Sequence, residues 1–252
     1  MTMQEFFIQN PTAAVAFSGG VDSAWLLHEA RTWARRTAAY FVRTPLQPDF
    51  ELEDARDIAR RLDVPLTVLA FDVLSVPQAA ANPPDRCYHC KRALFTRLME
   101  AAGADGFPLV LDGCNASDDA SDRPGMAALA ELGVRSPLRE CGLTKGDIRA
   151  AARKAGLPVW NKPSYACLAT RIPTGTAITS DLLARVARGE AALMARGFSD
   201  FRLRLRGDGA LLQVREEQMD MAREALPALG ELLREDFASI TLDSTPRYAR
   251  ET

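Results

Sequence analysis

The sequence lacks any hydrophobic run long enough to cross a membrane, since no apolar stretch approaches the roughly 18–20 residues of a membrane helix. Its first ten residues contain a glutamate and no basic segment, which argues against a secretory signal peptide. An excess of positive charge is also missing, because 31 Lys and Arg residues face 33 Asp and Glu residues, for a formal net charge of −2. Dedicated nucleic-acid binders normally carry a basic excess. We therefore predict a cytoplasmic protein with neither a membrane nor a nucleic acid as its partner.

Lysine and cysteine are scarce as well. Arginine supplies nearly all of the positive charge, because the only lysines are Lys91, Lys145, Lys154 and Lys162. Arginine suits phosphate and carboxylate ligands, although a compositional bias of the genome explains the same excess. The five cysteines are odd in number, and two of them form a Cys-x-x-Cys pair. In a cytosolic chain such a pair indicates metal or redox chemistry rather than structural disulfides.

The sequence does contain enough apolar residues for a sizeable core and a regular alternation of elements. Apolar residues make up 47% and charged residues 25% of the 252 residues, as in soluble globular proteins. Between residues 13 and 112, short apolar runs alternate with helical patterns, which predicts an α/β fold with a doubly wound parallel sheet. Ligands of such folds bind at the carboxyl ends of the strands. The expected strands are 13–17, 38–42, 66–71 and 109–112. One helix is expected after the first strand and ends near residue 35, and two more are expected at 49–62 and 91–102.

A second, smaller α/β domain is predicted after this sheet. Residues 75–86 contain three prolines and are expected to form a loop without regular elements. A helix is expected at 144–155, with Thr144 as its N-cap. The predicted boundaries are 1–161 for the first domain, 162–179 for a linker or active-site loop rich in Pro, Gly and Thr, and 180–252 for the second domain.

Within the second domain the pattern of helix and strand restarts. Ser180 is the expected cap of a helix that runs to about residue 196, and a later helix is expected to be interrupted or redirected at Pro227. The expected strands of this domain are 201–205, 210–214 and 239–242.

The hexapeptide Ser18-Gly19-Gly20-Val21-Asp22-Ser23 lies between the first expected strand and its helix. Two glycines allow a tight turn and a close approach of the backbone to a ligand, and the unpaired N–H groups of a helix start attract an anion. Ser18 and Ser23 add hydroxyl donors, whereas Asp22 beside a phosphate requires a Mg²⁺ ion or an amide between them. The segment is not a Walker A loop, because the Gly-Lys-Ser/Thr ending is absent. Phosphate binding is favoured over a purely structural Gly-Gly turn.

Three cysteines fall in two segments whose thiols are candidate ligands of a metal or cluster. Cys87 and Cys90 follow the proline-rich loop, and Cys167 lies in the expected linker. Three thiols from two loops match a [4Fe–4S] cluster with one iron left open for a non-protein ligand. Zinc with a fourth ligand, a redox pair and unrelated thiols are the alternatives. His89 lies between the first two thiols and is poorly placed as a further ligand.

The hexapeptide resembles the PP-loop of the ATP pyrophosphatase superfamily, which implies an adenine nucleotide alpha hydrolase-like fold for the first four strands. Further sequence motifs follow the hexapeptide in the same order as in one subgroup of this superfamily. Over roughly residues 13–215 the chain is similar to the LarE-type sulfur transferases that build the nickel-pincer nucleotide of lactate racemase. The segments that carry the resemblance are Asp112–Asp119, Arg123-Pro124-Gly125, Ser136-Pro137-Leu138, Thr144–Arg149 and Tyr165–Gly175.

The resemblance implies an enzyme that uses ATP to adenylate a carboxylate of a pyridinium bis-carboxylate mononucleotide, releases pyrophosphate and then forms a thiocarboxylate. In one version of the family, a single cysteine matching Cys167 gives up its own sulfur. In the other version, cysteines matching Cys87, Cys90 and Cys167 hold a [4Fe–4S] cluster that carries an extra sulfide, and this sequence has all three. The family also implies a homo-oligomer, a hexamer in known members, and a sulfide donor as a partner.

Roles for individual residues follow from the same resemblance. The PP-loop is expected to hold pyrophosphate or the α-phosphate, with Asp22 and Asp118 as candidate Mg²⁺ ligands. Hydrogen bonding in caps or turns is the alternative role for these two aspartates, and a solvated surface position is the alternative for Lys145. The predicted catalytic residues are Cys167, Asp22 and Asp118, and the predicted nucleotide-binding set is completed by Asp112, Asn115, Lys145 and Arg171.

Arg202, Arg204 and Arg206 occupy alternate positions of an expected strand and therefore share one face. The family has a similar Arg-x-Arg strand for its substrate phosphate, and Glu190 matches a helix glutamate near its site. Glu190, Arg202 and Arg204 are thus candidate substrate-binding residues, with a solvated hairpin face and helix surface as the alternative. The tail after residue 243 reads Ser-Thr-Pro-Arg-Tyr-Ala-Arg-Glu-Thr and departs from the family's ending, which leaves room for a different substrate.

Three competing functions stay open at this point. A tRNA thiolase of the same superfamily fits the PP-loop and the cysteines, but not the net charge or the lack of an added RNA-binding domain. A non-catalytic iron–sulfur or zinc module with a degenerate PP-loop is disfavoured by the intact hexapeptide. An amidotransferase-type synthetase that uses ammonia does not need three cysteines.

Overall fold

A computed structural model describes residues 1–118 and 124–247 of the chain. Asp119 and Arg123, which belong to the motifs quoted above, lie outside the described residues, as does the end of the tail from residue 248. The chain divides into two units. Unit 1 consists of Met1–Ala79 and Asp85–Lys162, and unit 2 consists of Ala80–Pro84 and the chain from Pro163 onward.

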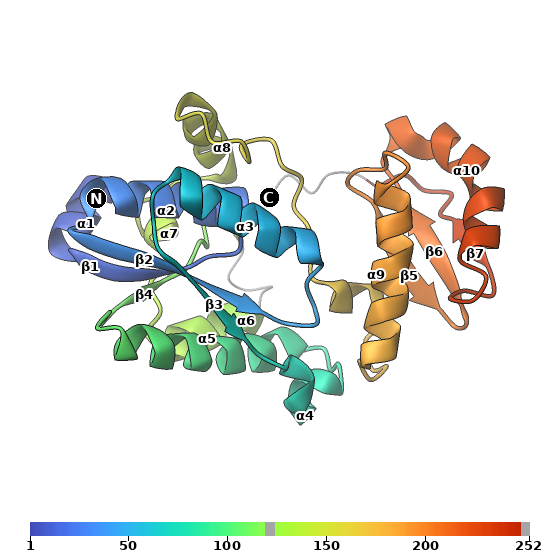
Figure 1. Cartoon of the computed structure of the whole chain (residues 1–252), viewed down its shortest axis with the longest axis horizontal. Coiled ribbons are helices and arrows are strands. Elements are labelled where there is room, and N and C mark those ends of the chain that lie inside the picture. The colour runs from blue at the N-terminus through green and yellow to red at the C-terminus, as the bar shows by residue number, and fades with distance from the viewer. Residues whose placement is uncertain (119–123, 248–252) are drawn as a thin grey trace. The chain divides into compact units, whose positions relative to one another are not determined.

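Unit 1 is built on a four-stranded parallel sheet in the order β3-β2-β1-β4 (Figure 1). Its strands are β1 (Thr12–Ala16), β2 (Arg36–Arg43), β3 (Leu66–Ala70) and β4 (Val110–Leu111). The predicted doubly wound parallel sheet is therefore confirmed. Val15 of β1 pairs with Ala39 of β2 and with Leu111 of β4, so β1 lies in the middle of the sheet and is buried on both faces.

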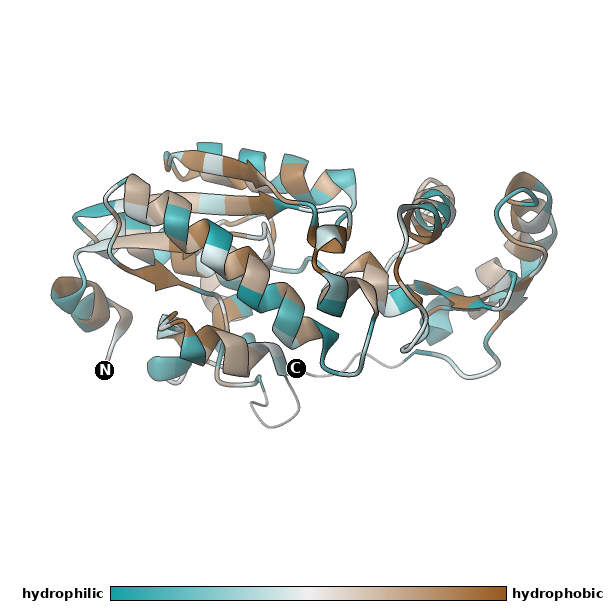
Figure 2. Ribbon diagram, turned by 90° about the horizontal axis from the view of Figure 1, so that it is seen from below, coloured by the Kyte–Doolittle hydropathy of each residue, from teal (hydrophilic) through white to brown (hydrophobic). Residues whose placement is uncertain are grey.

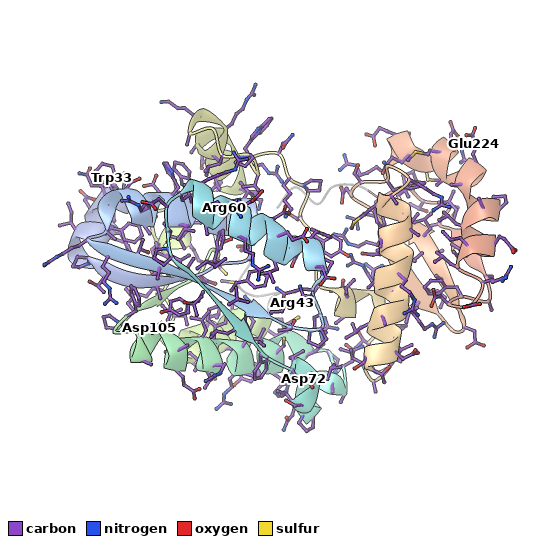
Figure 3. The ribbon with its side chains drawn as sticks, in the orientation of Figure 1. Trp33, Arg43, Arg60, Asp72, Asp105 and Glu224 are labelled. Atoms are coloured by element: carbon purple, nitrogen blue, oxygen red, sulfur yellow. The ribbon has the colours of Figure 1, made fainter. Side chains whose placement is uncertain are left out.

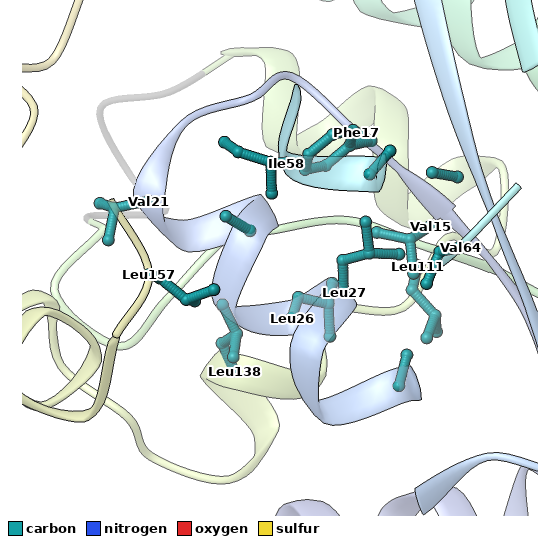
Figure 4. Close-up of a cluster of buried hydrophobic side chains, with 14 of the residues drawn as sticks. Val15, Phe17, Val21, Leu26, Leu27, Ile58, Val64, Leu111, Leu138 and Leu157 are labelled. Atoms are coloured by element: carbon teal, nitrogen blue, oxygen red, sulfur yellow. The ribbon is translucent and has the colours of Figure 1, made fainter. Parts of the chain in front are cut away.

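Two hydrophobic clusters cover the two faces of this sheet. Ala13 and Val15 of β1 point into one cluster, together with α2 (Val21–Trp33) and α3 (Asp49–Arg61), as Figure 4 shows for Val15, Leu27 and Ile58. Ala14 points into the other cluster, which contains Leu98 and Ala102 of α5 (Arg86–Ala104). The alternation along β1 is the period of two that a strand imposes. Along the helices of unit 1, hydrophobic and hydrophilic residues alternate in Figure 2, as expected for helices with one buried face.

Several short helices of unit 1 differ from the sequence prediction. Helix α1 (Met3–Gln9) was not expected, although Thr2 and Glu5 form a capping box at its start. The expectation that residues 75–86 hold no regular element is wrong, because a 3-10 turn (Val73–Ser75) precedes the short helix α4 (Pro77–Ala80). Pro77 is the first residue of α4, a position where its missing N–H has no helical partner to lose. The remaining helices of unit 1 are α6 (Pro124–Glu131), α7 (Pro137–Glu140) and α8 (Lys145–Lys154), the last capped by Thr144 as predicted.

Unit 2 contains a three-stranded sheet in the order β5-β6-β7. Strands β5 (Arg202–Arg206) and β6 (Gly209–Gln213) are antiparallel, and β7 (Ile240–Leu242) pairs parallel to β6. Its helices are α9 (Ser180–Met194) and α10 (Met219–Leu232), with 3-10 turns at Leu168–Arg171 and Glu216–Gln218.

Two details of unit 2 correct the sequence prediction. Thr179, not Ser180, is the N-cap of α9, and its side chain accepts a hydrogen bond from the Leu182 N–H. Helix α10 is not interrupted at Pro227 but continues through it. A proline removes one helical hydrogen bond, and the packing of the buried Ala222 and Leu229 on the same helix offsets that loss.

The short segment Ala80–Pro84 belongs to unit 2, although unit 1 supplies the chain on both sides of it. Asn82 anchors this segment: its side chain is fully buried and its amide donates to the carbonyls of Pro173 and Thr176, at 2.9 and 3.0 Å. Gly175 donates its N–H to the Asn82 carbonyl in return. Asn82 has a φ of +56°, a left-handed conformation that asparagine tolerates better than most residues. None of the helices in residues 1–118 and 124–247 is both long enough and apolar enough to span a membrane.

Candidate active site

The PP-loop connects β1 to α2 in unit 1, at the carboxyl end of a central strand. Ser23 Oγ donates to the Gly20 carbonyl at 3.1 Å, accepts from the Ser18 N–H at 3.2 Å and shares a hydrogen bond with Ser18 Oγ. The two hydroxyls predicted as phosphate donors thus brace the loop from within. The first bond from the helix to its cap runs from the Ala24 N–H to the Gly20 carbonyl, which leaves the N–H groups of the preceding helical residues for a ligand.

The glycines of the loop have different tasks. Gly19 has a φ of +72°, and a Cβ there would lie 3.1 Å from the backbone nitrogen of Ala55 in α3. A Cβ on Gly20 would meet only Ser18 Oγ, at an ordinary 3.5 Å. Gly19 is therefore required by the fold, whereas Gly20 leaves space beside the start of α2 where a phosphate can approach the backbone.

Asp22 and Lys145 form an ion pair in which Lys145 Nζ lies 2.5 Å from Asp22 Oδ2. Both side chains are mostly buried, and Asp22 Oδ1 is buried without a hydrogen-bond partner among the described residues. A buried carboxylate oxygen without a partner is costly in a folded protein. Asp22 therefore fits the predicted Mg²⁺ ligand, and Lys145 is not the solvated surface residue of the alternative interpretation.

The loop after β4 positions Lys145 through a series of hydrogen bonds. Asp112, which is buried, accepts from Ser136 Oγ at 2.5 Å and from Cys114 Sγ at 2.8 Å. Ser117 Oγ accepts from the Lys145 N–H at 3.0 Å. Within the same loop the Asn115 side chain accepts from the Ser117 N–H, and Asp118 accepts from the Asn115 N–H, both at 2.9 Å. Asp112, Asn115 and Asp118 thus form turn hydrogen bonds that shape this loop.

Cys114 is the half-buried thiol of this loop. Burial, and next the nearby Asp112 carboxylate, raise the pKa of Cys114 to about 12, so the thiol is protonated at neutral pH. A thiolate is the reactive form of cysteine. The surroundings of Cys114 therefore favour a structural thiol over a sulfur nucleophile.

Cys87 and Cys90 lie three residues apart in the first turns of α5, where Cys87 is exposed and Cys90 is half-buried. His89, between these two cysteines in the chain, has its Nε2 atom 3.2 Å from Asp85 Oδ2. Together with Arg92 it lines a shallow cavity of about 450 Å³. The expectation that His89 is not a further ligand stays a prediction. No disulfide joins any of the five cysteines, all of which the structure describes.

The other predicted residues belong to unit 2 and form a buried network around Glu190. Arg171, which is 1% exposed, donates from Nε to Glu190 Oε1 at 2.6 Å and from Nη2 to Oε2 at 3.1 Å. Tyr165 also donates to Glu190, and the Leu203 N–H donates to it at 3.1 Å. Cys167 caps the 3-10 turn that carries Arg171. Glu190 therefore joins α9, β5 and the Cys167 segment, and its described partners are protein groups.

Arg202 and Arg204 are held by backbone carbonyls. Arg202, 8% exposed, donates to the carbonyls of Phe201 and Ser164 at 2.6 and 3.1 Å. Arg204 donates to the Thr170 carbonyl at 2.9 Å and to the Gln213 side chain at 2.7 Å. Burial, and next the nearby Arg171 and Arg247, lower the pKa of Arg202 to about 10. Both residues lie on one face of β5, as predicted, in a region with an excess of positive charge.

Sequence reasoning missed two residues of this region, Asp200 and Arg247. Asp200 accepts ion pairs from Arg215 and Arg247, each at 3.0 Å, and lies 3.9 Å from Arg202. Asp200 lies just before the expected strand 201–205, outside its pattern, so its nearness to Arg202 is its only signal in the sequence. Arg247 carried no signal, because it lies in the tail that departs from the family.

The structure thus brings the predicted residues together in two sets, one in each unit. In unit 1 they gather around the PP-loop, and in unit 2 around Arg171 and Glu190. Cys87 and Cys90 belong to unit 1 and Cys167 to unit 2. Within the described residues, the structure holds no group of three or more His, Cys, Asp or Glu side chains arranged to bind a metal. Arg43, which is labelled in Figure 3, lies at the carboxyl end of β2. It forms an ion pair with Asp49 at the start of α3.

Comparison with known proteins gives relatives along nearly the whole chain. No family model matches it. An uncharacterized protein of Synechocystis is 35% identical over 247 residues, which are 96% of this chain and 91% of the relative. The pyridinium-3,5-bisthiocarboxylic acid mononucleotide synthase of Lactiplantibacillus plantarum is 34% identical over 238 residues, 91% of this chain and 84% of the relative.

More distant similarity extends to the wider superfamily. The tRNA-specific 2-thiouridylase MnmA of Acidithiobacillus ferrooxidans is 30% identical over 177 residues, which are 58% of this chain and 50% of that enzyme. The identity over nearly the whole chain, the parallel sheet and the PP-loop lead to one conclusion: this chain belongs to the LarE-type sulfur transferases of the PP-loop superfamily, the family of the pyridinium-3,5-bisthiocarboxylic acid mononucleotide synthase.

Proposed function

We propose that this protein uses ATP to activate a carboxylate of a pyridinium bis-carboxylate mononucleotide and then replaces a carboxylate oxygen with sulfur. The relative from Lactiplantibacillus is named for the synthesis of a pyridinium bisthiocarboxylic acid mononucleotide, which supports a thiocarboxylate as the product. The observation that carries ATP use is the PP-loop, where the start of α2 and the buried Asp22 Oδ1 atom lack partners among the described residues. A polyphosphate with its Mg²⁺ ion supplies what both groups need.

The activation step is a transfer of the adenylyl group. A carboxylate oxygen of the substrate attacks the α-phosphorus of ATP, the bond between the α-phosphorus and the bridging oxygen breaks, and pyrophosphate leaves. The N–H groups at the start of α2 stabilise the negative charge of the leaving pyrophosphate. Asp22 holds the cation that accompanies the phosphates, and Lys145 is released from Asp22 to contact a phosphate oxygen. In this proposal Asp112, Asn115 and Asp118 act by shaping the loop that presents Lys145.

Unit 2 supplies the substrate-binding groups of the proposal. Arg202 and Arg204 bind the phosphate of the mononucleotide, because guanidinium groups bind phosphates with paired, charge-assisted hydrogen bonds. Glu190 acts as a positioning residue, since its carboxylate holds Arg171, Tyr165 and the backbone of β5. The Cys167 segment is thereby fixed to the strand that carries both arginines.

Sulfur reaches the activated carboxyl carbon in the second step, and AMP is the leaving group. We propose Cys87, Cys90 and Cys167 as ligands of a [4Fe–4S] cluster, which when bound supplies a transferable sulfide from its open iron. Two thiols three residues apart at a helix start suit this group, because the helix dipole favours thiolates there. A sacrificial Cys167 is the other source of sulfur in the family. Mg²⁺ and the cluster are thus the proposed cofactors, and a sulfide donor is the proposed partner.

The test is an anaerobic purification followed by measurement of iron, zinc and acid-labile sulfide. We expect about four irons per chain, lost in each of the variants Cys87→Ala, Cys90→Ala and Cys167→Ala. The matched controls Cys114→Ala and Cys141→Ala should retain the iron. The pyridinium bis-carboxylate mononucleotide should trigger pyrophosphate release and gain sulfur, as detected by mass spectrometry. Stoichiometric zinc without labile sulfide contradicts the cluster, and conversion of Cys167 to dehydroalanine identifies it as the sulfur source.

Thiolation of tRNA is the second candidate, favoured by the similarity to MnmA. That similarity covers 58% of the chain, whereas the similarity to the mononucleotide synthase covers 91%. Tight co-purification of tRNA with the protein, together with tRNA-dependent pyrophosphate release, would favour the thiolase. Assembly into a homo-oligomer and a location in the cytoplasm stay predictions.

A further inference from the structure

Asn82 holds the turn that follows the Cys167 segment. Its side-chain amide donates to the carbonyls of Pro173 and Thr176 at 2.9 and 3.0 Å, and the Thr176 N–H closes the turn with a 3.0 Å bond to the Pro173 carbonyl. Gly175 within the turn donates its N–H to the Asn82 carbonyl at 2.8 Å. An asparagine amide has two N–H donors, and a fully buried one must find its acceptors in the protein. One residue therefore fixes both ends of the turn, and all of these contacts lie within unit 2.

A short and stiff route leads from Asn82 to Cys87. Four residues separate them in the chain, and the first two are Pro83 and Pro84. Each proline ring fixes its own φ, and Pro83 is restricted further by the proline that follows it. Helix α5 begins at Arg86, directly before Cys87. A displacement of Asn82 is therefore passed on to the first turn of α5.

The route from Cys167 to the same turn is packed along its length. The Cys167 carbonyl accepts from the Thr170 N–H at 3.0 Å and from Thr170 Oγ1 at 2.8 Å. Three of the four residues in the 3-10 turn Leu168–Arg171 are at most 1% exposed. Ile172, which precedes Pro173, is buried as well. The position of Cys167 is thus coupled to the turn that Asn82 holds.

The other end of the Cys167 stretch is anchored in unit 1. Arg149 of α8 donates from Nη2 to the Lys162 carbonyl at 3.1 Å, and Lys162 Nζ lies 2.5 Å from Asp54 Oδ2. Unit 2 resumes at the next residue in the chain. The stretch from Lys162 to Gly175 is therefore held at both ends. A loop held at both ends has fewer accessible conformations than a loop held at one end.

We infer that Asn82 is a positioning residue for sulfur transfer, which ties the chain before Cys87 to the turn after Cys167 and so presents the thiols of both segments together. The two cysteines are 80 positions apart in the chain. Asn82, however, lies five positions before Cys87 and bonds to Gly175, eight positions after Cys167. The inference rests on the proposed function for the role of the cysteines, but its first test needs neither a cluster nor a substrate.

The test uses dibromobimane, a reagent that bridges two thiols lying a few ångströms apart, on the full chain purified anaerobically with EDTA. The variants are Asn82→Ala and Asn82→Gly. Glycine adopts a left-handed backbone readily, so Asn82→Gly removes the side chain while it tolerates the native φ of +56°. The matched control is Asn161→Ala, because Asn161 is an exposed asparagine at the end of unit 1.

Peptide mass mapping should find Cys167 bridged to Cys87 or Cys90 in the unaltered protein. The yield of this product should fall about tenfold in both Asn82 variants, as expected for the loss of side-chain hydrogen bonds. The yield should stay unchanged in Asn161→Ala. A bridge between Cys87 and Cys90, which lie on one helix, is the internal reference and should form equally in all of the proteins.

A second readout separates positioning from general stability. In single turnovers with ATP and the pyridinium bis-carboxylate mononucleotide, Asn82→Gly should slow sulfur transfer about tenfold. The rate of pyrophosphate release should stay the same, because the PP-loop residues belong to unit 1 and the described contacts of Asn82 lie in unit 2. A loss of stability alone would lower both rates together, and thermal unfolding followed by circular dichroism measures that loss.

Four results overturn the inference. They are the absence of a Cys167 bridge in the unaltered protein, an unchanged yield in the Asn82 variants, an equal fall in Asn161→Ala, and equal slowing of pyrophosphate release and sulfur transfer. If Asn82→Ala does not fold, Asn82→Gly decides the test. A bridge that depends on Asn82 in a protein that transfers no sulfur contradicts the proposed function alone. Sulfur transfer at an unchanged rate in Asn82→Gly contradicts this inference alone.

Discussion

The two regions that are expected to bind phosphates are built in opposite ways. In the PP-loop of unit 1, the side chains of Ser18 and Ser23 brace the backbone, and backbone N–H groups are left for the ligand. In unit 2, backbone carbonyls of Phe201 and Thr170 brace the side chains of Arg202 and Arg204, and guanidinium groups are left for the ligand. The comparison teaches that the first site should fail when a backbone position gains a side chain. The second should fail when a side chain is removed.

The largest effect is expected from Gly20→Val, which tests the backbone half of the comparison. A Cβ at Gly20 meets only Ser18 Oγ at 3.5 Å, so the fold should persist while the side chain blocks phosphate. Pyrophosphate release should fall by on the order of 10³-fold, as when oriented donors lose access to a reacting anion. Gly103→Val on α5, where a Cβ meets nothing within 4 Å, is the control. Unchanged pyrophosphate release in Gly20→Val would show that the loop is structural.

Glu190→Ala tests whether the side-chain site depends on a buried partner. The change leaves Arg171 buried without its carboxylate, and breaking a buried ion pair in this way costs about 3–5 kcal/mol. Urea denaturation followed by circular dichroism should show this loss in the free energy of unfolding. Glu224→Ala, at the exposed position labelled in Figure 3, should change it by less than about 0.5 kcal/mol. Equal stabilities for the two variants would remove Glu190 from its positioning role.

Lys145→Ala sharpens the comparison, because Lys145 is a side chain that acts in the backbone-built site. It is paired with Asp22, and its loss leaves that carboxylate mostly buried without a cation. We expect ATP affinity to fall about tenfold, which corresponds to one charge-assisted contact. The matched control is Lys154→Ala at the exposed end of the same helix. If Lys154→Ala weakens ATP binding as much, net charge rather than the position of Lys145 governs affinity.

The last prediction concerns the rates at which iodoacetamide alkylates the cysteines of apoprotein at pH 8, a readout that leaves both phosphate-binding regions unchanged. Burial, and next Asp112, raise the pKa of Cys114 to about 12, so only a very small fraction of the molecules carries the thiolate at that pH. The exposed Cys87 should react first and Cys114 very slowly, as peptide mass mapping would show. In urea all five cysteines should react at similar rates. Rapid alkylation of folded Cys114 would contradict its structural role.

Local sequence signals predicted the parts of the molecule that depend on neighbours in the chain. The parallel sheet and the α8 cap at Thr144 are confirmed, because apolar runs and capping residues act over a few positions. The missed helix α1 also had such a signal, in the capping box of Thr2 and Glu5. At residues 75–86 the prolines predict a loop without regular elements, although Pro77 begins the short helix α4.

Contacts between distant residues could not be predicted in the same way. Asp200 meets Arg247 because β5 and β7 flank β6 in one sheet, an order that the pattern of single strands does not contain. The pairing of Asp22 with Lys145 likewise joins α2 to α8 across 123 positions. The sequence motifs predicted Asp22 and Lys145 as site residues, but neither Asp200 nor Arg247, and they did not indicate which carboxylate faces which cation.

The segment Ala80–Pro84 has a consequence for limited proteolysis and for the construction of chimeras. Because it belongs to unit 2 while its flanks belong to unit 1, neither unit is one continuous stretch of the chain. A single proteolytic cut near residue 162 would leave this segment attached to unit 1 at both of its ends, while the rest of unit 2 lies on the other fragment. A gene fragment ending there would carry Asn82 without the Pro173 and Thr176 carbonyls that satisfy its amide. The two units therefore cannot be exchanged between relatives by joining gene halves, and a chimera would have to transfer both pieces of unit 2 together.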